Sequence, residues 1–156
     1  EAGRDDVAFY TGNDDSILAD LLTPFPVMVG GEMKVRFIDG GLLGQWAVWT
    51  RAAVDLLRRA RVARAGGMVE TALLREGAAL TDANGAIFDA VHGYAGCIAG
   101  IHEVLRRQGL LAGTWCLDPR ESLSPGQAED IERVSRTYPF LTDDAFVAER
   151  LDDWLS

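Results

Sequence analysis

Lysine is almost missing from this chain of 156 residues, which holds one, Lys34, beside fourteen arginines. A side-chain amine that attacks a carbonyl must come from a lysine, so such chemistry within this chain rests on that residue. The sequence also lacks any run of about 20 apolar residues, the length that a membrane-spanning helix needs. Its first six residues are polar, without the pattern of a secretory signal. We therefore expect no membrane partner and a cytoplasmic protein.

Cysteine and histidine are scarce as well. Cys97 and Cys116 lie nineteen positions apart and form no CxxC motif, so a buried free thiol is the expected state of each. His92 and His102 have no further ligands at the spacing that zinc sites use. The sequence therefore predicts no metal and no other cofactor.

Positive charge is in deficit, because the net charge is −9 at pH 7. Nucleic-acid binding requires clustered lysine and arginine, so this balance argues against a nucleic-acid partner. One arginine-rich segment, residues 58–64, is more typical of a solvated helix face. Hydrophobic residues make up 48% of the chain, which is enough for a globular domain with a real core.

The N-terminal part of the chain predicts a strand, a polar turn and a helix. Residues 7–10 form a short apolar run that indicates a buried strand, and residues 11–15 are typical of a turn. A short helix over about residues 16–22 should follow, capped by one of the polar residues at its start. This order is half of a βα repeat.

A second unit follows. Residues 27–38 predict a hairpin, or an insertion that leads into a second buried strand at 34–38. Apolar residues at helical spacing then predict a long helix over about 43–65. The remainder predicts helices separated by turns and one extended connector, at about residues 69–76, 86–91, 98–108, 125–137 and 142–155.

Four segments resemble, in order, the dihydrodipicolinate synthase/N-acetylneuraminate lyase family. Residues 9–15, FYTGNDD, resemble the end of that family's barrel strand seven, and residues 38–44, IDGGLLG, would occupy strand eight and its loop. Residues 97–109, CIAGIHEVLRRQG, and residues 117–127 resemble the helices after the barrel. The resemblance implies an α/β fold: the C-terminal part of a (β/α)₈ TIM barrel, strands seven and eight, followed by a helical extension, in a chain that is itself mostly α.

The same resemblance implies the domain organisation and the function. Residues 1–66 would form the end of the barrel, with a hairpin-like insertion at 27–38, and residues 67–156 a C-terminal helical domain. The family consists of class I lyases, in which a strand-six lysine forms a Schiff base with a 2-oxo acid such as pyruvate. The match begins after strand six and Lys34 falls in the insertion, so we expect the catalytic lysine upstream of Glu1 and assign no catalytic residue here.

Two functions follow from this. The first is the C-terminal portion of such a lyase, with a small 2-oxo acid as substrate. That protein would be a homo-oligomer, or would associate with the missing N-terminal half of the barrel. The alternative is a non-catalytic helical interaction module derived from such a barrel, which the missing catalytic lysine favours.

The candidate substrate-binding residues are Thr11, Gly12, Asn13, Ile38 and Gly40. Gly12 matches the family's strand-seven glycine, whose backbone lies near the substrate, and Ile38 lies near the matching strand-eight position. Active sites of this fold are built at the C-terminal ends of the strands, so these residues would shape the substrate site. The same segments also fit a glycine turn with an aspartate helix cap, and a connection that lets a helix pack closely.

Overall fold

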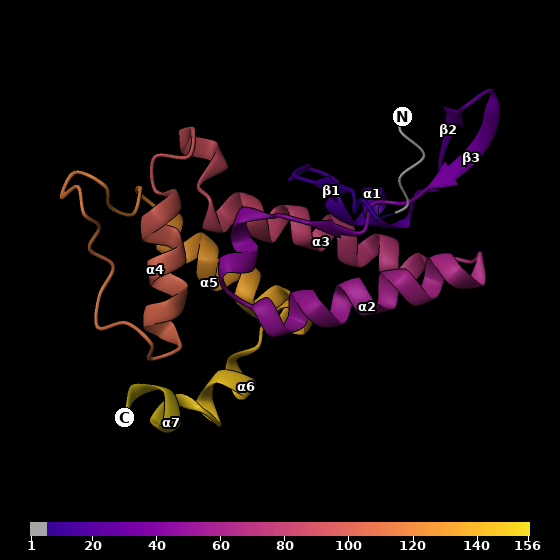
Figure 1. The fold of residues 1–156 in the computed structure, drawn as a ribbon. Helices are drawn as coiled ribbons and strands as arrows, with labels where there is room; N and C mark the ends of the chain where they lie inside the picture. Colours follow the sequence, from indigo (N-terminus) through magenta and orange to yellow (C-terminus); the bar gives the residue numbers. More distant parts are fainter. Residues whose placement is uncertain (1–5) are drawn as a thin grey trace.

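The computed structural model describes residues 6–156 and shows a mixed α/β fold that is mostly helical (Figure 1). Two small sheets lie near the N-terminal end of the described chain, and helices make up most of the remainder. No helix within residues 6–156 is both long and apolar enough to cross a membrane. The coarse fold class thus agrees with the sequence.

The first sheet is a short parallel pair. Strand β1 (Tyr10–Thr11) lies beside β4 (Gly40–Gly41), and a backbone hydrogen bond of 2.8 Å from Asp39 to Phe9 extends the pair at its N-terminal side. The prediction of a buried strand at residues 7–10 is wrong for this structure, because the side chains of that segment are exposed. Strand β1 has one neighbouring strand among the described residues, β4, so its other edge is unpaired and the side chain of Tyr10 is exposed.

The second sheet is a hairpin that projects away from the helices (Figure 1). Strand β2 (Phe25–Val29) pairs antiparallel with β3 (Glu32–Arg36). Gly30 and Gly31 form the two-residue loop, with φ angles of 60° and 88°. Two successive positive φ angles are what a tight hairpin turn requires, and glycine adopts them at low cost. The predicted hairpin is therefore present, and residues 34–36 belong to it rather than to the parallel sheet.

Seven α-helices and three 3₁₀ helices are found in the described part of the chain. They are α1 (Ile17–Leu22), η1 (Gly44–Ala47), α2 (Thr50–Gly66), α3 (Thr71–Ile87), η2 (Ala90–His92), α4 (Cys97–Arg107), α5 (Gln127–Thr137), η3 (Pro139–Leu141), α6 (Asp144–Ala148) and α7 (Leu151–Leu155). Helix α3 packs against α1, η1, α4 and α5, and so lies at the centre of the helical part.

The predicted break within α3 is wrong, because its polar residues make tertiary contacts rather than cap a new helix. The hydroxyl of Thr81 donates to the backbone carbonyl of Asp15 at 2.7 Å, and Asn84 accepts from the backbone N–H of Gln45 at 3.2 Å. Helix α2 also begins later than predicted, since the residue before it, Trp49, has a left-handed conformation with φ of 54°. The predicted final helix is divided into α6 and α7.

One buried cluster of apolar side chains holds the described chain together. It includes Leu18 of α1, Leu80 of α3 and Ile131 of α5, so residues from both sides of position 66 share the same core. Between α2 and α3, Arg59 also forms an ion pair with Glu76. The βα-type N-terminal part and the helices after it therefore pack as neighbours.

Helix α4 approaches the end of α3 very closely at Gly100. A Cβ atom added there would lie 2.0 Å from the carbonyl oxygen of Ile87 and 2.7 Å from Nε2 of Gln127. Gln127 is buried, and its side-chain amide donates to the carbonyls of Ile87 at 3.2 Å and Gly96 at 3.1 Å. The first residue of α5 thus joins the end of α3 to the start of α4.

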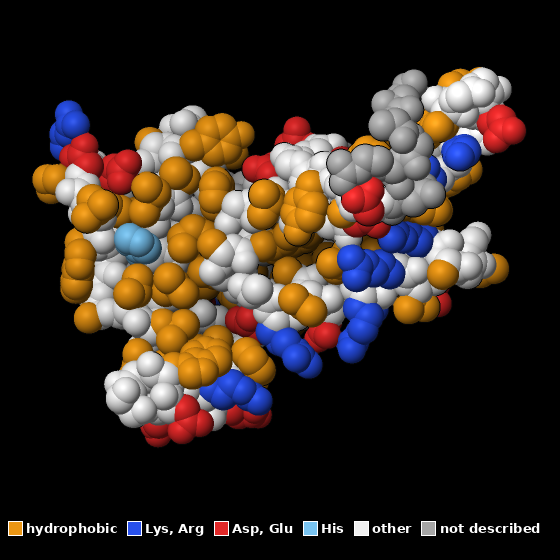
Figure 2. Space-filling view, in the orientation of Figure 1, with side chains coloured by type: hydrophobic (Ala, Val, Ile, Leu, Met, Phe, Trp, Pro, Cys, Tyr) orange, Lys and Arg blue, Asp and Glu red, His pale blue; other side chains and the backbone are white. Residues whose placement is uncertain are grey.

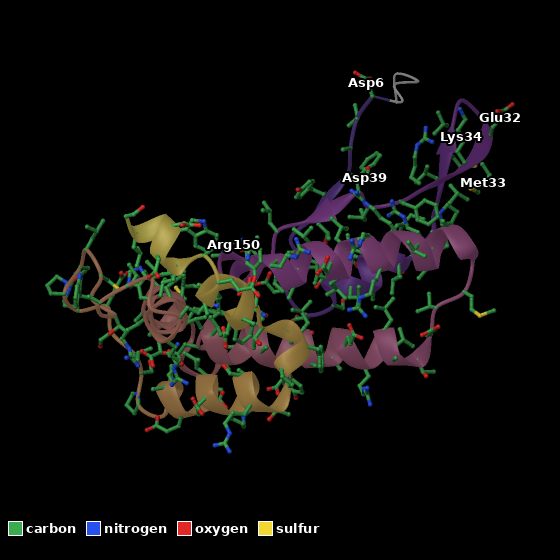
Figure 3. The ribbon with its side chains drawn as sticks, turned by 90° about the horizontal axis from the view of Figure 1, so that it is seen from below. Asp6, Glu32, Met33, Lys34, Asp39 and Arg150 are labelled. Atoms are coloured by element: carbon green, nitrogen blue, oxygen red, sulfur yellow. The ribbon has the colours of Figure 1, made fainter. Side chains whose placement is uncertain are left out.

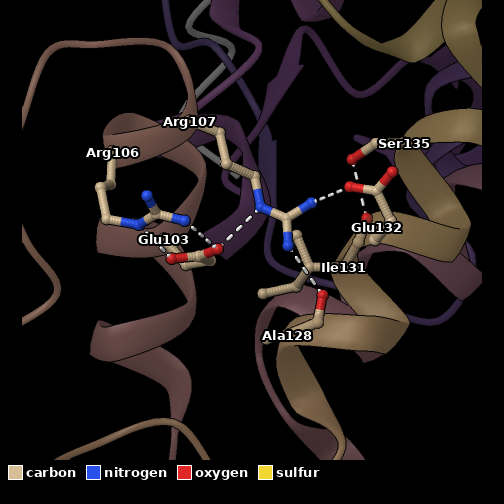
Figure 4. Close-up of polar contacts among 7 residues, drawn as sticks. All are labelled: Glu103, Arg106, Arg107, Ala128, Ile131, Glu132 and Ser135. Carbon is tan, nitrogen blue, oxygen red and sulfur yellow. Dashed lines mark hydrogen bonds and ion pairs between the residues drawn. The ribbon is translucent and has the colours of Figure 1, made fainter.

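A buried carboxylate makes a second link between α4 and α5 (Figure 4). Glu103 accepts hydrogen bonds from Arg106 at 2.7 and 2.8 Å and from Arg107 at 2.8 Å. The bonds from Arg106 outweigh the effect of burial, and those from Arg107 add to them, so the pKa of Glu103 lies below its usual range. Arg107 continues to α5, where it pairs with Glu132 and donates to the carbonyl of Ala128.

The close contact at Gly100 gives a stability prediction. Gly100→Ala should lower the free energy of unfolding by about 1–3 kcal/mol, because the added methyl group collides with backbone that cannot move alone. Gly85→Ala is the matched control, since a Cβ at that position in α3 meets nothing within 4 Å. The control should raise stability by roughly 0.4–1 kcal/mol. Urea denaturation followed by circular dichroism measures both, and equal stability of the two variants would contradict the packing described.

Candidate functional site

The polar turn after β1 is held by its own side chains. Thr11 donates its hydroxyl hydrogen to Asp20 of α1 at 2.6 Å, and accepts from the backbone N–H of Asn13 at 3.2 Å. The side-chain oxygen of Asn13 accepts from the backbone of Asp15 at 3.2 Å and of Ser16 at 3.3 Å. The side-chain oxygen of Asn13 therefore supports the turn before α1, whereas Ser16 at the N-cap makes no capping hydrogen bond through its side chain.

The glycines of the candidate site have different surroundings. Gly12 is exposed, and a Cβ built on it meets no atom within 4 Å, so its backbone is open to a ligand. Gly40 is buried, and a Cβ there would lie 3.0 Å from the ring of Tyr10 on the paired strand. At the next residue, Gly41, the same test places Cδ1 of Ile17 at 2.6 Å. The β4 glycines thus let Tyr10 and α1 approach the strand.

Ile38 lies at the other end of the parallel pair from Thr11, Gly12 and Asn13. Its side chain packs against the core, and its carbonyl accepts a hydrogen bond of 2.7 Å from Arg64 of α2. The structure therefore groups three of the five predicted residues at the C-terminal end of β1. Gly40 is paired with Tyr10, one residue before Thr11, and Ile38 is separated from the three.

A small cavity of about 250 Å³ lies at the N-terminal end of this pair. The guanidinium of Arg64 lies 4.8 Å from the ring centroid of Phe37, which also lines this cavity. Phe9 and Asp39 also line the cavity, and the backbone N–H of Phe9 donates to the carboxylate of Asp39 at 3.0 Å. None of the five predicted substrate-binding residues lines this cavity, so it is not the predicted substrate site.

Lys34 lies on β3, opposite Val27 in the hairpin. Figure 3 shows it on the projecting hairpin with Glu32 and Met33, apart from Asp39 beside β4. Its side chain is exposed. An amine that forms a Schiff base is activated by desolvation or by a neighbouring cation, and an exposed hairpin position provides no desolvation.

Sequence reasoning did not find a buried aspartate after α3. Asp89 is 3% exposed and accepts hydrogen bonds from the hydroxyl of Ser124 at 2.5 Å and the backbone N–H of Gly96 at 2.9 Å. Nδ1 of His92 lies 2.6 Å from its other oxygen. Burial opposes ionisation, but these hydrogen bonds outweigh it, so the pKa of Asp89 lies below its usual range.

The group of Asp89, His92 and Ser124 is not a nucleophilic triad. The carboxylate lies between the other two, so the hydroxyl of Ser124 donates its hydrogen bond to Asp89 and has no histidine base beside it. The two bonds to Asp89 instead hold His92 of η2 and Ser124, on the connector before α5, in fixed positions. The residues lie up to thirty-five positions apart, and no spacing in the sequence indicates that they meet.

Cys116 and His102 form the other pair with the elements of a nucleophile. Sγ of Cys116 lies 3.8 Å from Nδ1 of His102, and the same nitrogen lies 3.1 Å from the carbonyl oxygen of Trp115. Burial, and then the charges of Glu121 and Cys97, raise the pKa of the Cys116 thiol. A catalytic cysteine needs a lowered pKa, so this pair has the opposite property. Both cysteines are free, as predicted, but neither is the buried thiol that the sequence predicted, because each is partly exposed.

A buried amide lies directly after β4. Gln45 of η1 is 1% exposed, and its side-chain oxygen is a buried atom without a hydrogen-bond partner among the described residues. Its backbone is held by Asn84 of α3, as described above. An unpaired buried acceptor costs about 1–3 kcal/mol, so this position is a second polar feature that the sequence did not indicate.

Within residues 6–156, no group of three or more His, Cys, Asp or Glu side chains is arranged to hold a metal ion. Comparisons of the chain with models of known families, with curated proteins and with solved structures found no match.

The pKa of Asp89 gives a prediction about acid stability. A lowered pKa in the folded state stabilises the fold above about pH 4, the range of an unperturbed aspartate, and this contribution is lost as the pH falls through the folded value. Asp89→Asn should therefore lower the free energy of unfolding by about 1.5–3 kcal/mol at pH 7. The difference from the unchanged protein should shrink below about pH 4.

Asp153→Asn is the control, because Asp153 is exposed on α7. It should change the unfolding free energy by less than about 0.5 kcal/mol at every pH. Urea titrations at a series of pH values give these differences. A cost of Asp89→Asn that stays constant with pH would show that the ionised carboxylate is not what stabilises the junction.

Proposed function

We propose that this chain is the C-terminal portion of a dihydrodipicolinate synthase-like lyase that acts on a pyruvate-type 2-oxo acid. The Schiff-base lysine lies outside the chain. The observation that carries the proposal is the parallel pairing of β1 with β4, at the two segments that resemble strands seven and eight. Consecutive strands of a (β/α)₈ barrel are parallel neighbours of this kind.

The connection between the strands supports the same proposal. A parallel pair needs a crossover, usually through a helix, and α1 lies between β1 and β4 in the chain. Helix α1 packs on the pair through Ile17, which contacts the position of Gly41. The hairpin of β2 and β3 is then an insertion after the helix, which agrees with its projection from the body (Figure 1).

The turn after β1 provides what this function requires of the chain. The backbone at Gly12 is open, while Thr11 and Asn13 hold the turn through their own hydrogen bonds. A rigid turn with accessible peptide groups can shape the space around a bound 2-oxo acid without taking part in proton transfer. The bond formation itself would use the lysine of strand six.

The exposed outer side of the parallel pair supports an incomplete barrel. Val7, Phe9, Tyr10 and Leu42 are large apolar residues beside or within the pair, and all are exposed. Parallel sheets occur almost only where both faces are covered, and a two-stranded one has two open edges. Further strands of the same barrel would cover these edges and side chains.

Reductive trapping tests the lyase. The product of the whole gene, incubated with pyruvate and borohydride, should gain the mass of one reduced pyruvyl group on a lysine outside residues 1–156. The variant Lys34→Ala should trap to the same extent, since Lys34 is exposed on the hairpin. Peptide mass spectrometry locates the adduct. No adduct with any 2-oxo acid, or an adduct lost in Lys34→Ala, would refute the proposal.

The open edges also support a second candidate, a non-catalytic interaction module derived from such a barrel. In that case another chain pairs with β1 or β4 by strand addition. We expect Phe9→Glu to lower the mass of the assembly in light scattering, because a buried charge at the new edge is costly. A protein that is a stable monomer, or whose mass is unchanged by Phe9→Glu, would contradict this candidate.

A further inference from the structure

A cavity of about 490 Å³ lies where the start of α2 meets α4, α5 and α6. Its wall includes Trp49 directly before α2, Arg106 and Arg107 of α4, and Arg136 of α5. We call it the arginine cavity. Figure 2 shows Lys and Arg side chains gathered over α2 on one face of the molecule, and the cavity lies at the N-terminal end of that helix. Its volume is within the range of pockets that hold small organic molecules.

The wall of the arginine cavity carries a net positive charge although the chain is acidic. Three of the five charged side chains that line the cavity are arginines, and the other two are Glu132 and Asp144. The net charge of the whole chain is −9. An excess of arginine in one cavity of an acidic protein favours an anionic ligand at that place.

The two carboxylates of the wall already have partners. Glu132 pairs with Arg107, which Figure 4 shows reaching from α4 to α5. Oδ1 of Asp144 accepts a hydrogen bond of 2.8 Å from Gln108. Arg107 is also fully engaged, since each of its nitrogens donates a hydrogen bond to Glu103 or to α5. These bonds hold the wall in place, and a ligand would be held by other groups.

Two arginines of the wall have N–H groups that the chain does not use. Arg136 makes no hydrogen bond or ion pair with another described residue. Arg106 donates to Glu103 through Nε and Nη2, which leaves Nη1 without a partner within residues 6–156. Guanidinium groups with unused N–H groups are suited to bind carboxylate and phosphate oxygens.

The indole of Trp49 adds a third donor. Trp49 is 3% exposed, and its Nε1–H makes no hydrogen bond with a described residue. In the described chain, Oε1 of Gln45 is the one fully buried side-chain nitrogen or oxygen without a partner, so Nε1 of Trp49 must reach accessible surface. The surface that Trp49 lines is the arginine cavity. A buried indole N–H usually has a hydrogen-bond partner, and a ligand in the cavity would supply one.

We propose that the arginine cavity binds a small organic anion through a carboxylate or phosphate group. The oxygens of such a group accept hydrogen bonds, so they match the unused N–H groups of Arg106, Arg136 and Trp49. A planar guanidinium can bind two of these oxygens at once. Val104, also in the wall, offers apolar contact to the rest of the ligand. The inference does not depend on the lyase activity, because none of the five candidate substrate-binding residues lines the cavity.

An NMR titration of the isotope-labelled product of the whole gene tests the site at a single atom. The probes are benzoate for the carboxylate and phenyl phosphate for the phosphate. With at least one of them, the Nε1–H signal of Trp49 should move to lower field and reach saturation, because the indole gains a hydrogen-bond acceptor. Sodium chloride at the same ionic strength should not reproduce this shift.

Two arginine variants show whether the cavity itself holds the probe. Arg136→Gln should raise the dissociation constant by about 10-fold or more, the scale of a hydrogen bond to a charged group. The matched control is Arg75→Gln, which removes an exposed arginine of α3 that does not line the cavity and should leave the dissociation constant unchanged. Both positions are exposed, so the spectra of both variants without a probe should match that of the unchanged protein.

Three results would overturn the proposal: no saturable shift of the Trp49 signal with either probe, a shift that sodium chloride reproduces, or equal binding by Arg136→Gln and Arg75→Gln. Borohydride trapping of pyruvate is a separate readout on a lysine outside the chain. Failure of the anion site and failure of the lyase proposal can therefore be told apart.

Discussion

The contact between α4 and the last turn of α3 is the constraint on which the helical part depends. Only a residue without a side chain allows the backbone of α4 to lie against the carbonyl of Ile87, and Gly100 meets that requirement. Gln127, at the start of α5, donates hydrogen bonds from its side-chain amide to the carbonyls of Ile87 and Gly96 at this junction. Three helices are thus fixed by peptide groups and one amide, with little freedom for alternative packing.

The position of the connector follows from that junction. Asp89 holds Ser124 on one side, and His102 holds the carbonyl of Trp115 on the other, so both ends of the connector are attached to fixed elements. Leu123 of the connector packs against the core, but Trp115 and Leu117 stay outside it, because α3, α4 and α5 already pack against one another there. The exposure of Leu117 is therefore a result of tight packing elsewhere.

Local patterns in the sequence predict the local elements well. The Gly30–Gly31 pair specifies the hairpin turn, and the apolar spacing of residues 98–108 matches α4. The predictions fail where residues far apart in the sequence determine the local structure. The polar residues around Asn84 predict the start of a new helix, but in the structure Asn84 lies inside α3 and accepts a hydrogen bond from Gln45. The apolar run at 7–10 predicts a buried strand, but its side chains are exposed, because only one strand lies next to it. At the candidate site, the sequence locates the turn at Gly12 but not the involvement of Ile38 with Arg64.

The near absence of lysine has a consequence for chemical labelling of the protein. Because Lys34 is the chain's one side-chain amine and lies on an exposed strand of the hairpin, reagents that acylate amines will mark that strand and leave the helices untouched. A fluorophore or surface tether attached there is directed to an element that projects from the body. Enzymes that acetylate or ubiquitinate lysine side chains would find their acceptor on the same strand.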